Sequence, residues 1–126
     1  MPSTVRAAEG RRTETPNATM TTLASPTLGP SAGLSLWRVE MEPGAVGPLH
    51  TFDREQLWTV LDGEVTITVE GASSDIAAGD TIVIPATTER QVHARTAARL
   101  IVCGSGDAIA AVPGEEAPRG TPPWIA

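Results

Sequence analysis

Hydrophobic and polar residues alternate along several short stretches of this chain, as expected for β-strands with one buried face. The clearest stretch is 64–70, where Val65, Ile67 and Val69 alternate with polar residues. Further strands are predicted at 34–41, 56–61, 76–78, 81–84, 90–94, 99–103 and 108–112. No stretch has the 3.6-residue period of a long helix. The pattern therefore predicts an all-β sandwich or barrel.

Glycine and proline separate these runs, and one dipeptide gives a specific turn signal. Asp62-Gly63 lies between two predicted strands. We expect a two-residue hairpin there, because the mirror-image turn needs positive φ at both central positions. The stretch 118–126 lacks alternation and contains a Pro-Pro-Trp sequence. We expect it to be an extended tail in which Trp124 contacts the barrel or a neighbouring subunit.

The alternation begins only after the first part of the chain. Residues 1–19 are polar, rich in small side chains and aperiodic. They are predicted to be a disordered or non-native N-terminal extension, so that their deletion leaves the melting temperature unchanged. Residues 20–126 are predicted to form one β-barrel domain with an extended C-terminal tail, since the chain has the length of a single domain.

Composition narrows the classes of partner. Hydrophobic residues make up 40% of the chain, with one Phe, no Tyr and three Trp, so aliphatic side chains must supply most of the core. The net charge of −6 argues against a nucleic-acid partner. No apolar stretch is long enough to span a bilayer and no secretory signal is evident, so we expect no membrane partner and a cytoplasmic location. The single cysteine, Cys103, follows an apolar run and is expected to be a buried, unreactive thiol.

Between positions 44 and 63 the chain has the spacing of a metal-binding β-barrel motif. That motif places a His six residues after a Gly, a second His two residues later, a Glu four residues after that, and a Gly seven residues further. Gly44, His50 and Gly63 match it. Phe52 takes the position of the second His, and Gln56 takes that of the Glu.

A second motif follows between positions 79 and 94. It places a Pro six residues after a Gly and a His five residues after the Pro; Gly79 and Pro85 match, while Arg90 takes the His position. Thr87 and Ala94 replace the Gly and Asn of this motif. With these two motifs, over about residues 30–112, the chain resembles the small single-domain members of the cupin superfamily, with degenerate metal-binding motifs. The resemblance implies a double-stranded β-helix, or jelly-roll barrel, and a homodimer.

The replaced positions bear on the cofactor that the resemblance implies. Cupin sites of this kind hold a divalent metal with three His and one carboxylate, ligands that suit such ions. Phe52 has no lone pair to offer, and Arg90 is a fixed cation. We therefore expect no tightly bound metal and no other cofactor. The remaining alternative is a divalent ion held weakly by His50, Gln56 and water.

Without a metal, the same positions suggest a pocket for an organic ligand. His50 and Arg90 are the candidate catalytic residues: His50 to move a proton near neutral pH, and Arg90 to pair with a carboxylate or a developing enolate oxygen. Phe52, Gln56, Trp58 and Arg90 are the candidate substrate-binding residues, with Phe52 as an apolar wall.

Simpler interpretations stay open for each position. His50 follows a proline and could lie in an exposed turn, Gln56 could be a satisfied core amide, and Trp58 could only pack in the core. Arg90 could pair with Glu89 or Glu55 at the edge of the barrel. Strand parity places His93 on the face opposite Arg90, unless a bulge intervenes.

Three functions are compatible with this sequence. The first is a small cupin that binds a hydrophobic oxygenated molecule, enolic or acidic, and acts as a metal-independent isomerase or cyclase of polyketide-like type. The second is a metal-dependent, dioxygenase-like enzyme that uses His50 and Gln56. The third is a barrel that binds a small molecule without catalysis. The sequence does not decide whether the protein is an enzyme.

Overall fold

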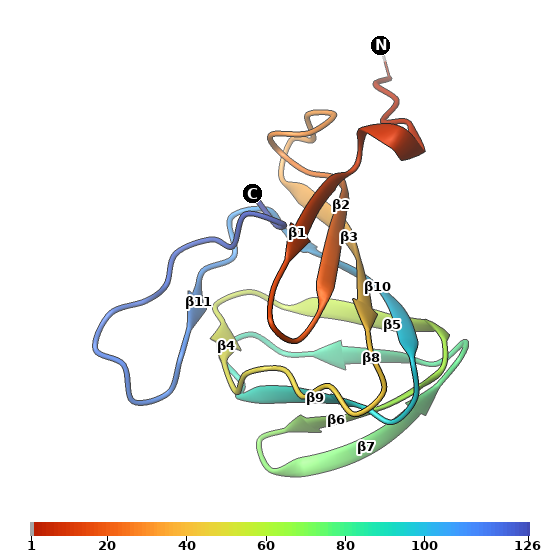
Figure 1. The fold of residues 1–126 in the computed structure, drawn as a ribbon. Helices are drawn as coiled ribbons and strands as arrows, with labels where there is room; N and C mark the ends of the chain where they lie inside the picture. The colour runs from red at the N-terminus through yellow and green to blue at the C-terminus, as the bar shows by residue number, and fades with distance from the viewer. Residues whose placement is uncertain (1) are drawn as a thin grey trace.

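The computed structural model describes residues 2–126, and β-strands dominate the architecture (Figure 1). The elements are η1 (Ala7–Glu9), β1 (Arg11–Glu14), β2 (Thr19–Ala24), β3 (Leu34–Met41), β4 (Thr51–Phe52), β5 (Gln56–Asp62), β6 (Glu64–Val69), β7 (Ala72–Ala77), β8 (Thr81–Ile84), β9 (Arg90–Ala94), β10 (Ala98–Ser105) and β11 (Ala110–Ala111). Among these residues, no helix is long and apolar enough to cross a membrane.

The predicted all-β jelly-roll architecture is confirmed. A six-stranded antiparallel sheet has the order β1-β2-β3-β10-β5-β8, and a three-stranded sheet has the order β7-β6-β9. A short pair, β11-β4, lies at one end. The alternation predicted the bounds of β3, β8 and β9 correctly, and it located β5 and β10 to within a few residues.

One core fills the space between the two larger sheets. Register places Trp37, Val102 and Trp58 in one row across β3, β10 and β5, all on the buried side. Val65 and Ile67 of β6 approach from the other sheet and are fully buried. Burying each such side chain stabilises the fold by about 1.5–3 kcal/mol, so this core holds the two sheets together.

The predicted hairpin at Asp62-Gly63 is wrong. β5 pairs with β10 and β8, whereas β6 pairs with β7 and β9, so the dipeptide carries the chain from one sheet to the other. Gly63 has a φ of 84°, and a Cβ built there would lie 2.1 Å from the main-chain oxygen of Ala97. A glycine is therefore required by close approach as well as by backbone conformation. The local pattern could not reveal this, since a sheet crossover and a hairpin begin with the same turn residues.

The N-terminal region also differs from the predicted disordered extension. Arg11–Glu14 forms β1 and pairs with β2 in a register that places Arg11 opposite Thr22. The strand escaped prediction because it has no apolar alternation; main-chain hydrogen bonds to β2 hold it instead. Met1 lies outside the described residues, and the native or non-native status of 1–19 stays a prediction.

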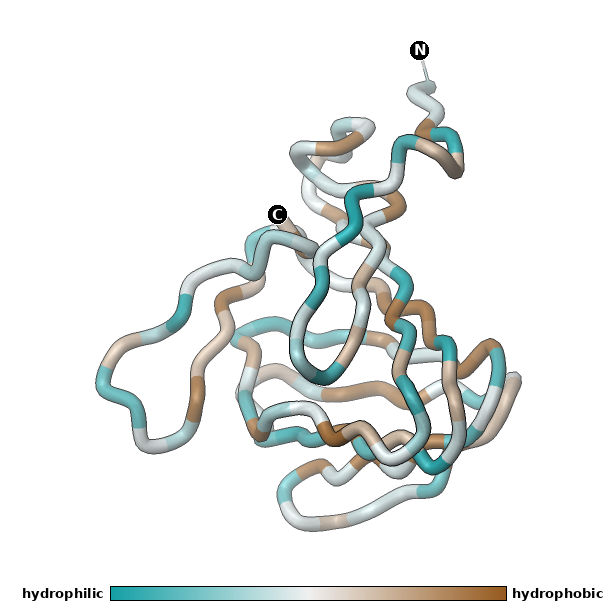
Figure 2. Tube along the Cα trace, in the orientation of Figure 1, coloured by the Kyte–Doolittle hydropathy of each residue, from teal (hydrophilic) through white to brown (hydrophobic). Residues whose placement is uncertain are grey.

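The end of the chain packs against the barrel, and its last residues form a turn instead of the expected extended tail, with the N–H groups of Ile125 and Ala126 donating to the Pro122 oxygen. Trp124 packs against the core, and Ile125 is fully buried. Thr22 Oγ1 donates a hydrogen bond to the main-chain oxygen of Trp124 (2.7 Å). Before this anchored stretch, residues 113–120 form an outer loop with mainly hydrophilic or neutral positions (Figure 2).

The outer face of the six-stranded sheet carries a short apolar row. Cys103, Leu57 and Val83 are neighbours across β10, β5 and β8. Leu57 is 43% exposed and Val83 is 55% exposed. The prediction of a buried Cys103 thiol is therefore wrong, because its parity on β10 places the half-buried side chain on this outer face.

Candidate functional site

A cavity of about 460 Å³ lies against the inner face of the six-stranded sheet. Its lining includes every aromatic side chain of the chain other than histidine, namely Trp37, Phe52, Trp58 and Trp124. His50 is the histidine in its wall. A concave site with aromatic walls and few polar groups is typical of small-molecule binding.

Local pairing brings the motif residues to this cavity. His50 and Arg90 face each other across an antiparallel bridge: the His50 N–H donates to the Arg90 oxygen (3.1 Å), and the Arg90 N–H donates to the His50 oxygen (2.9 Å). Phe52 lies two residues after His50, on β4, which pairs with β11. The two rings meet edge to face with centroids 5.0 Å apart. The first motif thus places an imidazole and a phenyl ring side by side in the cavity wall.

The His50 ring has a defined tautomer. Nδ1 lies 2.8 Å from the main-chain oxygen of Pro48. A carbonyl oxygen only accepts, so in the neutral ring Nδ1 carries the proton and Nε2 is left as an acceptor. Burial lowers the pKa of His50 below its ordinary value of 6.5; the Pro48 hydrogen bond opposes this effect, and the charge of Arg90 adds to it. A neutral imidazole with a free basic nitrogen is therefore the state expected at neutral pH.

Arg90 is fully buried, and no carboxylate pairs with it among the described residues. Nε donates to the Thr88 oxygen (3.1 Å), Nη1 to Gln56 Oε1 (3.2 Å), and Nη2 to the Pro85 oxygen (3.4 Å). The guanidinium carbon lies 5.3 Å from the centroid of the Phe52 ring, a cation–π arrangement. Burial lowers the pKa of Arg90 to about 10, so it stays charged at neutral pH.

The structure places Arg90 inside the barrel, but not in the cavity wall. Phe52 lines the cavity, and the guanidinium stacks on its ring. Direct contact between Arg90 and a ligand in the cavity is therefore not what this geometry provides. The alternative partners Glu89 and Glu55 are both exposed and form no ion pair with Arg90. His93 is half-buried, does not line the cavity and alternates with the buried positions of β9, as parity predicted.

Gln56 is also fully buried and does not line the cavity. Its Oε1 accepts hydrogen bonds from Trp58 Nε1 (3.0 Å) and from Arg90 Nη1 (3.2 Å), which fixes the amide orientation. Its Nε2 has no partner among the described residues. Gly104 lies opposite on β10, and a Cβ there would be 3.1 Å from Gln56 Cγ. A side chain at position 104 would therefore crowd the amide, a contact that the sequence motif does not reveal.

This donor set does not fit a divalent metal. Two hydrogen-bond donors already occupy Gln56 Oε1, and one of them is the cation Arg90. Phe52 offers a phenyl face where a ligand atom would be needed. Across residues 2–126, no three His, Cys, Asp or Glu side chains are grouped so that they could hold an ion. Metal content stays a prediction, which elemental analysis of the purified protein tests.

Two segments that the sequence did not associate with the site also line the cavity. The turn between β1 and β2 contributes residues 15–18, and Met20 follows on β2. From the end of the chain come residues 119, 120 and 122–124. In the sequence, the Pro-Pro-Trp run indicated that this second segment contacts the barrel. Nothing in the sequence of the turn indicated that it lines a cavity, because residues 15–18 lack large apolar side chains.

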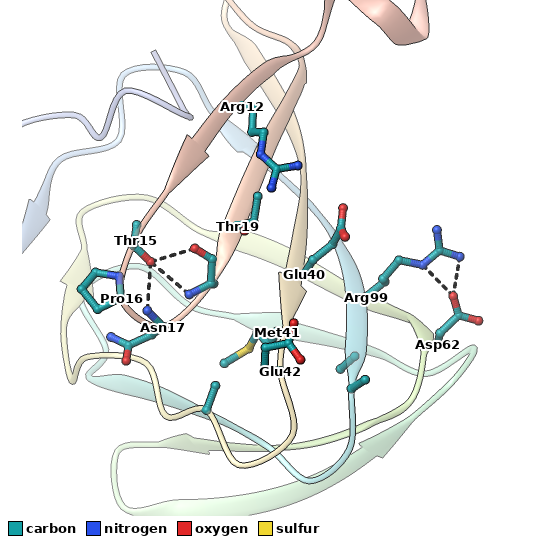
Figure 3. Close-up of a pocket in the computed structure, with 14 residues that line it drawn as sticks. Arg12, Thr15, Pro16, Asn17, Thr19, Glu40, Met41, Glu42, Asp62 and Arg99 are labelled. Carbon is teal, nitrogen blue, oxygen red and sulfur yellow. Dashed lines mark hydrogen bonds and ion pairs between the residues drawn. The ribbon is translucent and has the colours of Figure 1, made fainter.

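A second hollow of about 510 Å³ lies beside the β1–β2 turn (Figure 3). Several of its polar groups already have partners. Thr15 Oγ1 accepts from the main-chain N–H groups of Asn17 and Ala18, and Arg99 pairs with Asp62 (Nε to Oδ2, 2.7 Å). It contains no histidine and none of the motif residues. We therefore regard the aromatic cavity as the candidate site.

Similar solved structures share the fold. An RmlC-like cupin from Shewanella frigidimarina matches with a TM-score of 0.70 and 20% identity, over 83% of this chain and 94% of that one. KdgF from Halomonas sp. matches with a TM-score of 0.72 and 22% identity, over 83% and 94%. Salicylate 1,2-dioxygenase from Pseudoaminobacter salicylatoxidans matches with a TM-score of 0.72 and 16% identity, over 83% of this chain but 31% of that one. At these identities the similarity shows the fold alone.

Comparison at the level of sequence gives the family. A search of curated proteins finds no match. The sequence model described as "Cupin domain" matches residues 37–104. That match spans more than half of the 126 residues and contains all the motif positions described above, and the chain therefore belongs to the cupin family.

Proposed function

We propose that this protein binds a small hydrophobic molecule carrying an enolic or acidic oxygen, and that it can act on it as a metal-independent isomerase or cyclase. The observation that carries the proposal is the aromatic cavity of about 460 Å³ with the Nε2 atom of a neutral His50 available in its wall. The apolar body of the ligand would contact the rings of Trp37, Trp58 and Trp124.

The His50 tautomer selects the polar group of the ligand. Because Nδ1 donates to Pro48, Nε2 is a hydrogen-bond acceptor, and its preferred partner is a hydroxyl donor such as an enol or a phenol. An acidic ligand would instead transfer its proton to Nε2 and leave an ion pair. Both modes place the oxygenated end of the ligand beside Phe52.

The same atom supports a proton-transfer reaction. For a ketone in the cavity, Nε2 would take a proton from the carbon next to the carbonyl, and the resulting enolate would regain that proton at another atom, which is an isomerisation. Arg90 is proposed to act on the ligand through the electrostatic field of its charge and not by the direct contact expected from the sequence. Its buried charge, stacked behind Phe52, favours an enolate in the cavity over the neutral ketone.

A non-catalytic binding barrel is the second candidate, and the absence of a carboxylate base from the cavity lining among the described residues favours it. A dioxygenase-like enzyme is disfavoured because Gln56 Oε1 is already occupied by two donors.

The test is calorimetric titration with three bicyclic probes. The first is 2-naphthol, a locked enol. The second is 2-methoxynaphthalene, its methyl ether, which lacks the hydroxyl donor. The third is 2-naphthoate, which represents the acidic ligands. We expect 2-naphthol to bind more tightly than its methyl ether, and His50→Ala to remove that preference, a loss of about tenfold in affinity for one hydrogen bond.

The matched control is His93→Ala, which changes the half-buried histidine that does not line the cavity. Its affinity for 2-naphthol should equal that of the wild type. Failure of all three probes to bind the wild-type protein would refute the ligand class proposed here. Equal binding of 2-naphthol and 2-methoxynaphthalene would remove His50 from the recognition of the ligand.

A further inference from the structure

The β1–β2 hairpin and the C-terminal stretch of the chain contact each other, and both contribute residues to the candidate site. Arg11 of β1 donates from Nη1 to the main-chain oxygens of Pro123 (2.8 Å) and Ala126 (2.9 Å). Its Nη2 donates to Thr27 Oγ1 (2.6 Å). One guanidinium thus joins β1, the loop after β2 and the last residues of the chain, which we call the closing segment (residues 119–126).

Hydroxyl groups on the same side of the hairpin reinforce this contact. Register places Thr22 opposite Arg11, and Thr22 Oγ1 donates to the Trp124 oxygen (2.7 Å). Ser25 Oγ donates to the Ala126 oxygen (2.7 Å). Opposite residues of an antiparallel pair project from the same face, so β1 and β2 present Arg11 and Thr22 together to the closing segment.

The closing segment differs from the other walls of the cavity in how it is attached. Among the described residues, its main-chain hydrogen bonds to the rest of the chain are at Arg119 and Gly120, both to Ala110. The bonds of Ile125 and Ala126 stay within the segment. The walls formed by β3 and β5 are strands held by continuous ladders. The segment is thus the wall whose position depends most on side chains, and it should open with the lowest free energy.

Both partners of this contact face the ligand site. The hairpin contributes residues 15–18 and Met20 to the cavity, and the closing segment contributes Trp124 and its neighbours. If the contact between them is lost, the aromatic wall on that side loses its support, while the walls formed by β3 and β5 stay in place.

We propose that Arg11 is a positioning residue of the ligand site, which holds the closing segment against the β1–β2 hairpin so that the ligand enters and leaves by displacement of that segment. The effect of Arg11 on ligand affinity rests on the proposed function, whereas its effect on the position of the closing segment does not. Arg11 touches no ligand in this arrangement, and it acts through Pro123, Ala126 and the adjoining Trp124.

The experiment compares Arg11→Ala with the wild type by hydrogen exchange and by titration with 2-naphthol. We expect exchange in residues 119–126 to become about tenfold faster, the factor for loss of one net charged hydrogen bond, with β3 and β10 unchanged. The affinity for 2-naphthol should fall by a similar factor. Arg11→Lys, which can still donate to main-chain oxygens, should recover part of both effects.

Arg12→Ala is the matched control. Arg12 is the next residue, is exposed and bonds to Glu14 rather than to the closing segment. In Arg12→Ala, hydrogen exchange in residues 119–126 and the affinity for 2-naphthol should both match the wild type. Should Arg11→Ala unfold globally, Thr22→Val removes the neighbouring bond to Trp124 without removing a charge and should loosen the same segment.

The outcomes separate the two proposals. Unchanged exchange in 119–126 for Arg11→Ala and Thr22→Val would overturn the role of Arg11. Faster exchange with unchanged affinity for 2-naphthol would also overturn it, because the closing segment would then not be a wall of the ligand site. Absence of 2-naphthol binding by the wild type would count against the proposed function alone, and the exchange result would still decide whether Arg11 holds the segment.

Discussion

Arg90 places a buried cation where the motif has a metal ligand. It takes a motif position where a histidine ligand is expected, and its guanidinium lies fully buried among neutral oxygens and the Phe52 ring. Burying a charge without a counter-charge is costly, and the hydrogen bonds and the ring offset that cost. Arg90→Ala is therefore predicted to lower the stability of the protein substantially as well as to weaken ligand binding.

His50 should make the stability of the protein depend on pH. Burial lowers its pKa below the unfolded value of 6.5, so the unfolded chain binds a proton more readily than the folded one. The free energy of unfolding should therefore fall as the pH drops below about 6.5, and this contribution should level off below the lowered pKa. His50→Asn keeps a donor for the Pro48 oxygen but cannot titrate.

Urea unfolding of both proteins between about pH 8 and pH 5 checks this expectation. The wild type should lose more stability over that interval than His50→Asn. Parallel curves for the two proteins would show that His50 is not buried as a neutral group.

At the scale of elements, alternation predicted strands well and their partners poorly. β3 and β9 were located by patterns of burial that the sequence carries locally. The partner of β6 was missed, because Asp62-Gly63 has the same local chemistry in a hairpin as in a crossover between sheets. Pairing depends on contacts between distant segments, and alternation within one strand does not encode them.

Gly63 offers a test of that crossover. A Cβ at this position would lie 2.1 Å from the Ala97 oxygen, and φ is 84°. Gly63→Ala should therefore cost the strain of a left-handed residue, about 1–2 kcal/mol, plus displacement of the 97–98 backbone. Gly71→Ala is the control, since φ is 79° and no atom lies within 4 Å of its Cβ.

Chemical denaturation of the two variants measures the difference. Gly71→Ala should show only the conformational cost, and Gly63→Ala should lose about 2 kcal/mol or more beyond it. Equal losses would mean that the Ala97 backbone moves away freely.

At the scale of the whole molecule, the sequence predicted the barrel and some of the residues that line its aromatic cavity. Spacing identified His50, Phe52 and Trp58, which do line the cavity. It also selected Gln56 and Arg90, which lie buried behind that wall. The other walls escaped prediction, because they come from opposite ends of the chain and acquire their role only when folding brings them together. The homodimer implied by the family stays a prediction, which light scattering of the protein in solution tests.

Deletion of residues 1–19 should now lower the melting temperature, contrary to the expectation from sequence. The deletion removes β1, exposes the edge of β2 and takes away the hydrogen bonds that Arg11 donates to Pro123 and Ala126. A loss of about 1–2 kcal/mol corresponds to a decrease of about 5 °C or more in a domain of this size. Scanning calorimetry of the full chain and the truncated protein measures it; an unchanged transition would restore the interpretation of 1–19 as a dispensable extension.

The aromatic wall has a consequence for the optical properties of the protein. The chain contains three tryptophans and no tyrosine, and all three tryptophans line the cavity. Nearly all of its near-ultraviolet absorption and emission therefore originates at the candidate site. Any molecule that enters must displace solvent from an indole ring or quench its emission. Binding of a small molecule in the cavity should consequently change the tryptophan emission, so that titration followed by fluorescence can detect it without a label.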